Sequence, residues 1–302
     1  MTQPVIQTRD LTVYYGKVRG IKNVNLTVER GEAFGFLGPN GAGKTTTQRV
    51  LLDVIRPTAG SAFIFGMDCR KQGVEIRKRV GYLPGELALY KEMRAAEFFE
   101  MMEYLRGYNG AKGYWRSLCE RLDLDPSRKI RTFSRGNKQK VGIVAAFMNK
   151  PDLLILDEPT SGLDPLVQQT VMEMVREVKA DGRTVFFSSH ILPEVQAVCD
   201  RVGIIRAGEL VATERVGEML AARFKRMTLT FPNLPPEEAF ALPGVTVVSR
   251  TPTSMTLEVR ENLARVLSLA AQHNVRDLET HNMSLEEVFL AFYERGNGGT
   301  HA

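Results

Sequence analysis

The chain has 302 residues, of which 43% are hydrophobic and 25% charged, and its formal net charge is +5. This composition is ordinary for a globular protein, and the length leaves room for one large domain or for a large and a small one. The small positive excess is compatible with a surface near phospholipid or nucleic acid, but solvated surface charge explains it as well, so it identifies no partner.

No window of the sequence approaches the roughly 18 apolar residues that a transmembrane helix needs. The first residues lack the basic start and apolar core of a signal peptide, so we expect the chain to remain in the cytosol. Cys69, Cys119 and Cys199 are widely spaced and follow no metal-binding pattern, which favours free thiols in a reducing compartment.

Two strands are predicted at the start of the chain. Residues 5–15 and 21–28 show the apolar alternation of strands, and turns are predicted at 16–20 and 29–32. Together they indicate an antiparallel flap with Tyr14 and Tyr15 at its tip.

The next apolar run leads into a phosphate-binding pattern. Residues 33–37 predict a buried strand, the following segment fits G-x-x-x-x-G-K-[ST], and helical character extends from about Thr46 to Ile55. The glycines let backbone N–H groups close around phosphate oxygens, and the positive end of the helix points to the same place. Lys44 can reach the β- and γ-phosphates, and the Thr45 hydroxyl can ligate Mg²⁺. The predicted phosphate site comprises Gly38, Pro39, Asn40, Gly41, Ala42, Gly43, Lys44, Thr45 and Thr46.

A glycine-rich turn that matches by chance is the alternative, but it explains poorly why a strand precedes the glycines and a Lys-Thr pair follows them. With a nucleotide on this loop, an aromatic ring at the flap tip could stack on adenine. A tyrosine that fills an edge of the flap fits the pattern equally well.

Between residues 57 and 150 the pattern predicts two short strands and then a mainly helical region. The strands lie at 62–65 and 80–84. Helical character extends from about 94 to 122 with a break near 108–110, and another helix begins near Ser134 and reaches Met148. We therefore expect a helical subdomain at about residues 90–150.

A wholly apolar segment, residues 153–156, predicts a strand covered on both faces of a parallel sheet. It places Asp157 and Glu158 at its carboxyl end, where open α/β sheets bind their ligands. Aspartate in this position holds Mg²⁺ in phosphate-loop proteins, and the neighbouring glutamate is placed to polarise an attacking water. His190 follows the next predicted strand, residues 184–188, at the edge where a γ-phosphate would lie, although a single histidine after a strand is usually incidental.

The remaining elements of this region are helices at 166–180 and 193–199 and strands at 202–205 and 210–211. Strands that alternate with helices predict an α/β fold. The expected architecture is a P-loop ATPase core with a mainly parallel sheet, an antiparallel β flap and a helical subdomain.

Beyond residue 222 the composition changes and prolines become frequent. The pattern predicts strands at 227–231, 245–250, 254–259 and 275–278 and a helix at 262–272. A capping box of Ser284 and Glu287 predicts a last helix, followed by a glycine-rich tail. We expect a nucleotide-binding domain at residues 1–222 and a small α+β accessory domain at 223–302 with a disordered tail.

These motifs, in this order, resemble the nucleotide-binding subunit of an ABC transporter over about residues 4–220. Residues 38–46 look like the Walker A loop, 153–158 like the Walker B segment and 161–164 like the D-loop. His190 resembles the switch histidine, and Tyr15 sits where the family stacks an aromatic ring on adenine. The segment Phe133-Ser134-Arg135-Gly136-Asn137 occupies the place of the signature loop, usually Leu-Ser-Gly-Gly-Gln, and fits it at Ser134 and Gly136.

The resemblance implies a mechanism. Two such domains enclose two ATP molecules, each held between the phosphate loop of one subunit and the signature loop of the other. Ser134 and Gly136 would then contact ATP across the interface, Glu158 would act as general base, and His190 would hold the γ-phosphate. Thr45 and Asp157 would hold Mg²⁺.

The implied partners are a second copy of the chain, or a homologous ATPase subunit, and an integral membrane permease. No nucleic acid is expected. The implied location is the inner face of the cell membrane, reached through the permease.

The segment Tyr82-Leu83-Pro84-Gly85-Glu86 departs from the family, which usually has a glutamine where Gly85 stands. That glutamine contacts Mg²⁺ and the attacking water. Either Glu86 replaces it as a ligand or water fills the gap, and we favour water because glycine indicates a mobile loop. This loop, the variant signature and the small C-terminal domain together resemble the ATPase subunits of bacterial ABC-2-type exporters.

Two other functions compete with an ATPase that drives a separate exporter permease. A soluble ABC ATPase acting on the ribosome or on nucleic acid would usually carry a second cassette or a long coiled coil, and the sequence shows neither. A regulatory nucleotide-binding module without turnover is disfavoured because both catalytic positions, Glu158 and His190, are filled.

Overall fold

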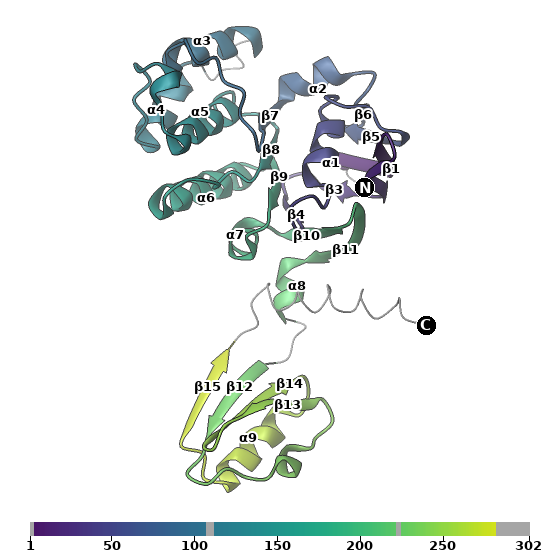
Figure 1. Cartoon of the computed structure of the whole chain (residues 1–302), viewed down its shortest axis with the longest axis vertical. Helices are drawn as coiled ribbons and strands as arrows, with labels where there is room; N and C mark the ends of the chain where they lie inside the picture. The colour runs from purple at the N-terminus through teal and green to yellow at the C-terminus, as the bar shows by residue number, and fades with distance from the viewer. Residues whose placement is uncertain (1–2, 107–111, 222–224, 282–302) are drawn as a thin grey trace. The chain divides into compact units, whose positions relative to one another are not determined.

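A computed structural model describes residues 3–106, 112–221 and 225–281, and the chain divides into two compact units, residues 1–215 and 216–302 (Figure 1). The domain boundary predicted at 222–223, the helix break near 108–110 and the last helix from Ser284 lie outside the described residues.

The first unit contains an antiparallel sheet built around one long strand. β1 (Ile6–Tyr15) pairs with β2 (Val18–Val24), β3 (Thr27–Val28) and β5 (Ala59–Ile64), and β5 pairs with β6 (Met67–Asp68). The strand predicted at 21–28 is wrong in its bounds, because the turn after Tyr15 is shorter than expected and β2 already begins at Val18. The Asn25 side chain bonds to Asp10 in the gap between β2 and β3.

The second sheet of this unit has the order β11-β10-β4-β9-β8-β7, and all of its pairs are parallel except β10 with β11. Every residue of β4, β8 and β9 is buried, as continuous apolar strands predict. The carboxyl ends of these three strands therefore meet at one edge of the sheet. The strands are β4 (Ala33–Leu37), β7 (Val80–Leu83), β8 (Leu153–Asp157), β9 (Thr184–Ser189), β10 (Arg201–Arg206) and β11 (Glu209–Arg215).

Helices cover this sheet and form the expected helical region. Of these, α3 and α4 contact α5, and α5 contacts β7 (Figure 1). Helix α2 was not predicted from the sequence, because its seven residues, GVEIRKR, carry too few apolar positions to show a helical period. The helices are α1 (Lys44–Leu51), α2 (Gly73–Arg79), α3 (Ala95–Arg106), α4 (Tyr114–Arg121), the 3₁₀ turn η1 (Ile130–Thr132), α5 (Arg135–Phe147), α6 (Pro165–Ala180) and α7 (Leu192–Val198).

The three cysteines are free and buried. Burial raises the pKa of the Cys69 and Cys119 thiols to about 12, so both remain protonated and unreactive at neutral pH. Among the described residues, no helix has both the length and the apolar character needed to cross a membrane.

The second unit is a four-stranded antiparallel sheet of order β13-β14-β12-β15 with one helix, α9, packed against it (Figure 1). Its core contains Met227, Leu229 and Leu257 of the sheet and Val266 of the helix. The last strand begins later than predicted, because the backbone N–H of Val275 bonds to Ala270 and closes the end of α9. The elements are α8 (Val216–Ala221), β12 (Lys225–Thr230), the 3₁₀ turn η2 (Glu237–Phe240), β13 (Val245–Arg250), β14 (Ser254–Val259), α9 (Leu263–Gln272) and β15 (Asp277–His281).

Candidate active site

A cavity with a volume of about 390 Å³ lies at the carboxyl ends of β4 and β8. The flap tip, the loop after β4 and the segments after β7 and β8 all contribute to its wall. Its lining residues are Tyr15, Arg19, Gly20, Pro39, Asn40, Gly41, Gly43, Lys44, Thr45, Thr46, Gly85, Asp157 and Glu158.

The glycine loop of this cavity is packed so closely that two positions accept only glycine. A Cβ atom on Gly38 would lie 2.4 Å from the carbonyl oxygen of Ile205. Gly43 has a φ of 111°, and a Cβ atom on it would lie 2.5 Å from Ile21 Cγ2. These two glycines therefore let the loop pack against Ile21 and Ile205, while Gly41 and Gly43 line the cavity with backbone alone, as a cradle for phosphate oxygens requires.

The Lys44 side chain is 5% exposed and lies across this loop. Its Nζ atom donates to the carbonyl oxygens of Gly38 at 2.6 Å and Pro39 at 3.3 Å, and it lies 3.7 Å from Glu158 Oε1. Burial lowers the pKa of Lys44, and the charges of Glu158 and Asp157 partly oppose that shift. Lys44 thus places a buried positive charge where phosphate would bind.

Both oxygens of the buried Asp157 carboxylate accept a hydrogen bond. Thr45 Oγ1 donates to Oδ2 at 2.7 Å, and Ser188 Oγ donates to Oδ1 at 2.5 Å. Hydroxyl and carboxylate oxygens are the ligands that Mg²⁺ prefers, with phosphate and water completing its shell. Within the described part of the chain, no group of three or more His, Cys, Asp or Glu side chains could hold a metal ion.

Glu158 and His190 form a pair beside the cavity. His190 Nδ1 lies 3.0 Å from Glu158 Oε1, although the two residues follow different strands. Glu158 has a left-handed backbone, with a φ of 49°, and its N–H group bonds to the carbonyl oxygen of Ser188 at 3.1 Å. Gln139 of α5 donates to the carbonyl oxygens of Glu158 and Pro159, which fixes the chain just after β8.

At the other end of the cavity, the flap contributes Tyr15 and Arg19. Tyr15 Oη lies 3.3 Å from Thr46 Oγ1, and the ring packs against Gly20, where a Cβ atom would lie 2.9 Å from the ring carbon Cε2. Arg19 forms an ion pair of 2.9 Å with Glu209. Tyr14 is not among the lining residues, so of the two tyrosines at the tip the structure places Tyr15 on the cavity.

Six predicted site residues do not line this cavity, namely Gly38, Ala42, Glu86, Ser134, Gly136 and His190. Ser134 caps α5, where its Oγ accepts a hydrogen bond from the N–H group of Asn137 at 3.2 Å. Gly136 packs closely on the carbonyl oxygen of Gly162. Glu86 is exposed, whereas Gly85 lines the cavity so close to Asp157 that a Cβ atom on it would lie 3.1 Å from Oδ2.

Three residues of the site, Arg19, Gln139 and Ser188, were not predicted from the sequence. Ser188 could have been found, because neighbouring parallel strands place it opposite Asp157 in the register of β8 and β9. Arg19 and Gln139 gave no signal, since their contacts join segments that are far apart in the sequence.

Comparison with known proteins gives consistent results. Residues 21–161 match the family model described as ABC transporter. The chain is similar to the daunorubicin/doxorubicin resistance ATP-binding protein of Streptomyces peucetius, with 32% identity over 96% of this chain and 93% of that protein. It is also similar to the linearmycin resistance ATP-binding protein of Bacillus subtilis, with 36% identity over 69% of this chain and 68% of that protein. A solved ATP-binding subunit of an ABC transporter matches with a TM-score of 0.67 and 30% identity, over 72% of this chain and 92% of that one.

Proposed function

The chain belongs to the ABC transporter family of ATP-binding proteins, which are ATPases, and from this premise we propose that it drives a separate membrane permease of the exporter type. The observation that carries the proposal is the convergence of Lys44, Thr45, Asp157 and Glu158 on one cavity. The names of the two resistance proteins support export as the direction of transport.

In the proposed mechanism, each of these side chains has one task. The loop N–H groups and Lys44 bind the β- and γ-phosphates, which requires Lys44 to exchange its carbonyl partners for phosphate oxygens. Thr45 and Asp157 would hold Mg²⁺, which would neutralise charge on the phosphates. Glu158 takes a proton from the attacking water. His190, which the resemblance assigns to the γ-phosphate, contacts Glu158 at 3.0 Å in this structure, and we propose that it orients the Glu158 carboxylate.

We also propose that the active form is a dimer with a second copy or with a homologous subunit. Ser134 and Gly136 do not line the cavity of their own chain, so in a dimer they could contact the ATP bound to the partner subunit. The Ser134 oxygen accepts the Asn137 N–H, which leaves its O–H group to donate to a phosphate oxygen. The positive end of α5, a helix of 13 residues, strengthens such a contact.

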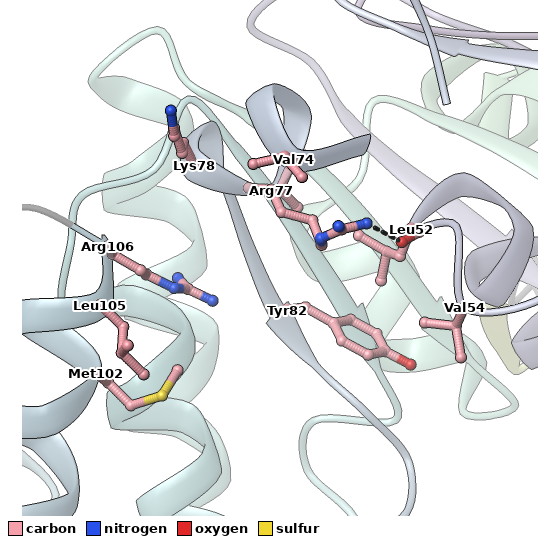
Figure 2. A pocket seen from close by; sticks show the side chains of 10 residues that line it. Leu52, Val54, Val74, Arg77, Lys78, Tyr82, Met102, Leu105 and Arg106 are labelled. Carbon is pink, nitrogen blue, oxygen red and sulfur yellow. Dashed lines mark hydrogen bonds between the residues drawn. The ribbon is translucent and has the colours of Figure 1, made fainter. Parts of the chain in front are cut away.

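We propose that the permease docks at a second cavity of the first unit. It has a volume of about 380 Å³ and is bounded by the end of α1, α2, β7 and α3. Figure 2 shows Val54, Val74 and Leu105 around its mouth, and these three side chains are 62–68% exposed. Exposed apolar side chains around a hollow are typical of a protein interaction site.

Arg106 gives this groove a preference for an acidic partner. Figure 2 shows its side chain reaching into the groove from the end of α3. Burial lowers the pKa of this guanidinium, and no ion pair to it occurs within the described residues. We therefore propose that a segment of the permease with apolar side chains and a carboxylate docks here and holds the ATPase on the inner face of the membrane.

The test is purification of the tagged chain from native membranes solubilised in detergent. We expect a polytopic membrane protein to co-purify with the wild type, and Arg106→Glu to lose it while the ATPase rate of the isolated chain remains. The matched control is Arg116→Glu on α4, which reverses an exposed cation outside the groove. Recovery of ribosomal RNA in place of a membrane protein would instead support a non-transport ABC ATPase.

A further inference from the structure

The carboxylate of Glu194, in the first turn of α7, lies between two segments of the candidate active site. Thr160 Oγ1 donates to Glu194 Oε1 at 2.5 Å, and Ser189 Oγ donates to Oε2 at 2.8 Å. Thr160 and Ser189 are only 2% and 1% exposed. Both oxygens of Glu194 are therefore used to bridge two buried hydroxyl groups.

These hydroxyl groups belong to the segments that carry the catalytic pair. Thr160 follows Glu158 by two residues, and Ser189 directly precedes His190. The backbone pairing of β8 with β9 ends at the bond from the Glu158 N–H group to the Ser188 carbonyl oxygen. Beyond that bond, the segments after the two strands are joined by the His190–Glu158 contact and by the two hydrogen bonds of Glu194.

The bridge has the properties of a rigid support. Hydrogen bonds from hydroxyl groups to a carboxylate are short and about twice as strong as those between neutral groups. Ser189 Oγ also accepts the N–H group of Ile191 at 2.9 Å, so the turn that carries His190 is held on both sides of the histidine. The 3.0 Å contact of His190 with Glu158 thus depends on a framework to which Glu194 contributes two bonds.

We propose that Glu194 is a positioning residue for ATP hydrolysis, which sets the distance between His190 and Glu158. Because Glu194 does not line the nucleotide cavity, it acts on the orientation of the base and leaves nucleotide binding unchanged. This inference rests on the proposed function, since the roles of Glu158 and His190 do.

The test compares Glu194→Ala, Glu194→Gln, His190→Ala and the double variant Glu194→Ala/His190→Ala. Glu194→Ala should lower kcat about tenfold and change KM less than twofold, whereas Glu194→Gln, which keeps one carbonyl acceptor, should retain more of the rate. In the His190→Ala background, Glu194→Ala should lower kcat by less than a further twofold, because the contact between His190 and Glu158 is already absent. The control Glu177→Ala, which breaks a surface ion pair with Arg121, should leave kcat unchanged.

A further tenfold loss in the His190→Ala background would show a general structural role and overturn the proposal, as would an unchanged kcat in Glu194→Ala. If Glu194→Ala does not fold, Thr160→Val removes one of the two donors and is expected to lower kcat with the same KM. Glu158→Gln distinguishes failure of the positioning role from failure of the proposed mechanism. If Glu158→Gln loses activity while Glu194→Ala keeps it, only the positioning role is refuted. Full activity in Glu158→Gln would refute the proposed mechanism itself.

Discussion

Replacement of Glu158 by glutamine tests the proposed mechanism most directly. Glutamine has the same shape as glutamate and can keep a hydrogen bond to His190, whose Nδ1 lies 3.0 Å from Glu158 Oε1. The substitution therefore removes the charge and the basicity of this side chain while it leaves the local geometry in place.

Two magnitudes follow from the site. Loss of a general base costs about 100-fold in rate or more, which corresponds to about 2.7 kcal/mol in the barrier at 1.36 kcal/mol per tenfold. The Lys44–Glu158 separation of 3.7 Å corresponds to an attraction of about 4.5 kcal/mol at an effective dielectric constant of 20, before any desolvation cost. In Glu158→Gln this attraction disappears, and so does the repulsion between the carboxylate and the γ-phosphate.

We therefore expect Glu158→Gln to hydrolyse ATP at least ~100-fold more slowly, to bind ATP no more weakly than the wild type, and to accumulate an ATP-bound dimer. Phosphate release measures the rate, titration with a fluorescent ATP analogue measures the affinity, and size-exclusion chromatography with ATP detects the dimer. Glu100→Gln, the same change at an exposed carboxylate of α3, should alter none of the three. A rate for Glu158→Gln within threefold of the wild type would place the base elsewhere.

Three further predictions concern neighbouring residues. Lys44→Ala should weaken ATP binding about 100-fold or more, because two charge-assisted bonds to phosphate are lost; near-normal affinity by calorimetric titration would contradict the phosphate-loop assignment. Because burial lowers the pKa of Lys44 from its ordinary value of 10.5, the folded chain releases this proton at a lower pH than the unfolded chain does. As the pH rises towards 10.5, ATP affinity should fall while the contribution of Lys44 to the free energy of unfolding becomes more favourable; Lys44→Met should lack both trends in titrations and denaturation curves. Glu86→Ala should leave the ATPase rate and its Mg²⁺ dependence unchanged in the isolated subunit, because Glu86 is exposed and does not line the cavity; a clear drop in rate would make Glu86 the substitute ligand.

The strands could be predicted where one local pattern determined them. The continuous apolar runs of β4 and β8 gave buried parallel strands, and β13 and β14 have the predicted bounds. The P-loop pattern placed Lys44 and Thr45 in the phosphate-binding segment that follows β4, because its spacing encodes the turn itself. The short helix α2 and the early start of β2 escaped prediction, because the first has almost no apolar period and the second depends on a two-residue turn.

The supporting contacts of the site could not be read from the sequence. Ser188 with Asp157, Gln139 with Pro159 and Glu194 with Thr160 are pairs separated by 20 to 34 positions. Each pair forms only when the strands and helices pack together, so no sequence motif predicts it. The reason for a glycine at position 85 could also not be predicted from the sequence. Only the close approach of this loop to Asp157 shows how little room a side chain would have there.

The separate apolar cores of the two units have a thermodynamic consequence. One core joins the sheets of residues 1–215, and another, built around Met227 and Leu257, belongs to the second unit. Two units with separate cores can unfold at different temperatures. A ligand raises the melting temperature only of the unit whose native form it binds. In a calorimetric scan, nucleotide should therefore shift one heat-absorption peak and leave the other in place, so that the unshifted peak serves as an internal standard in every experiment on this chain.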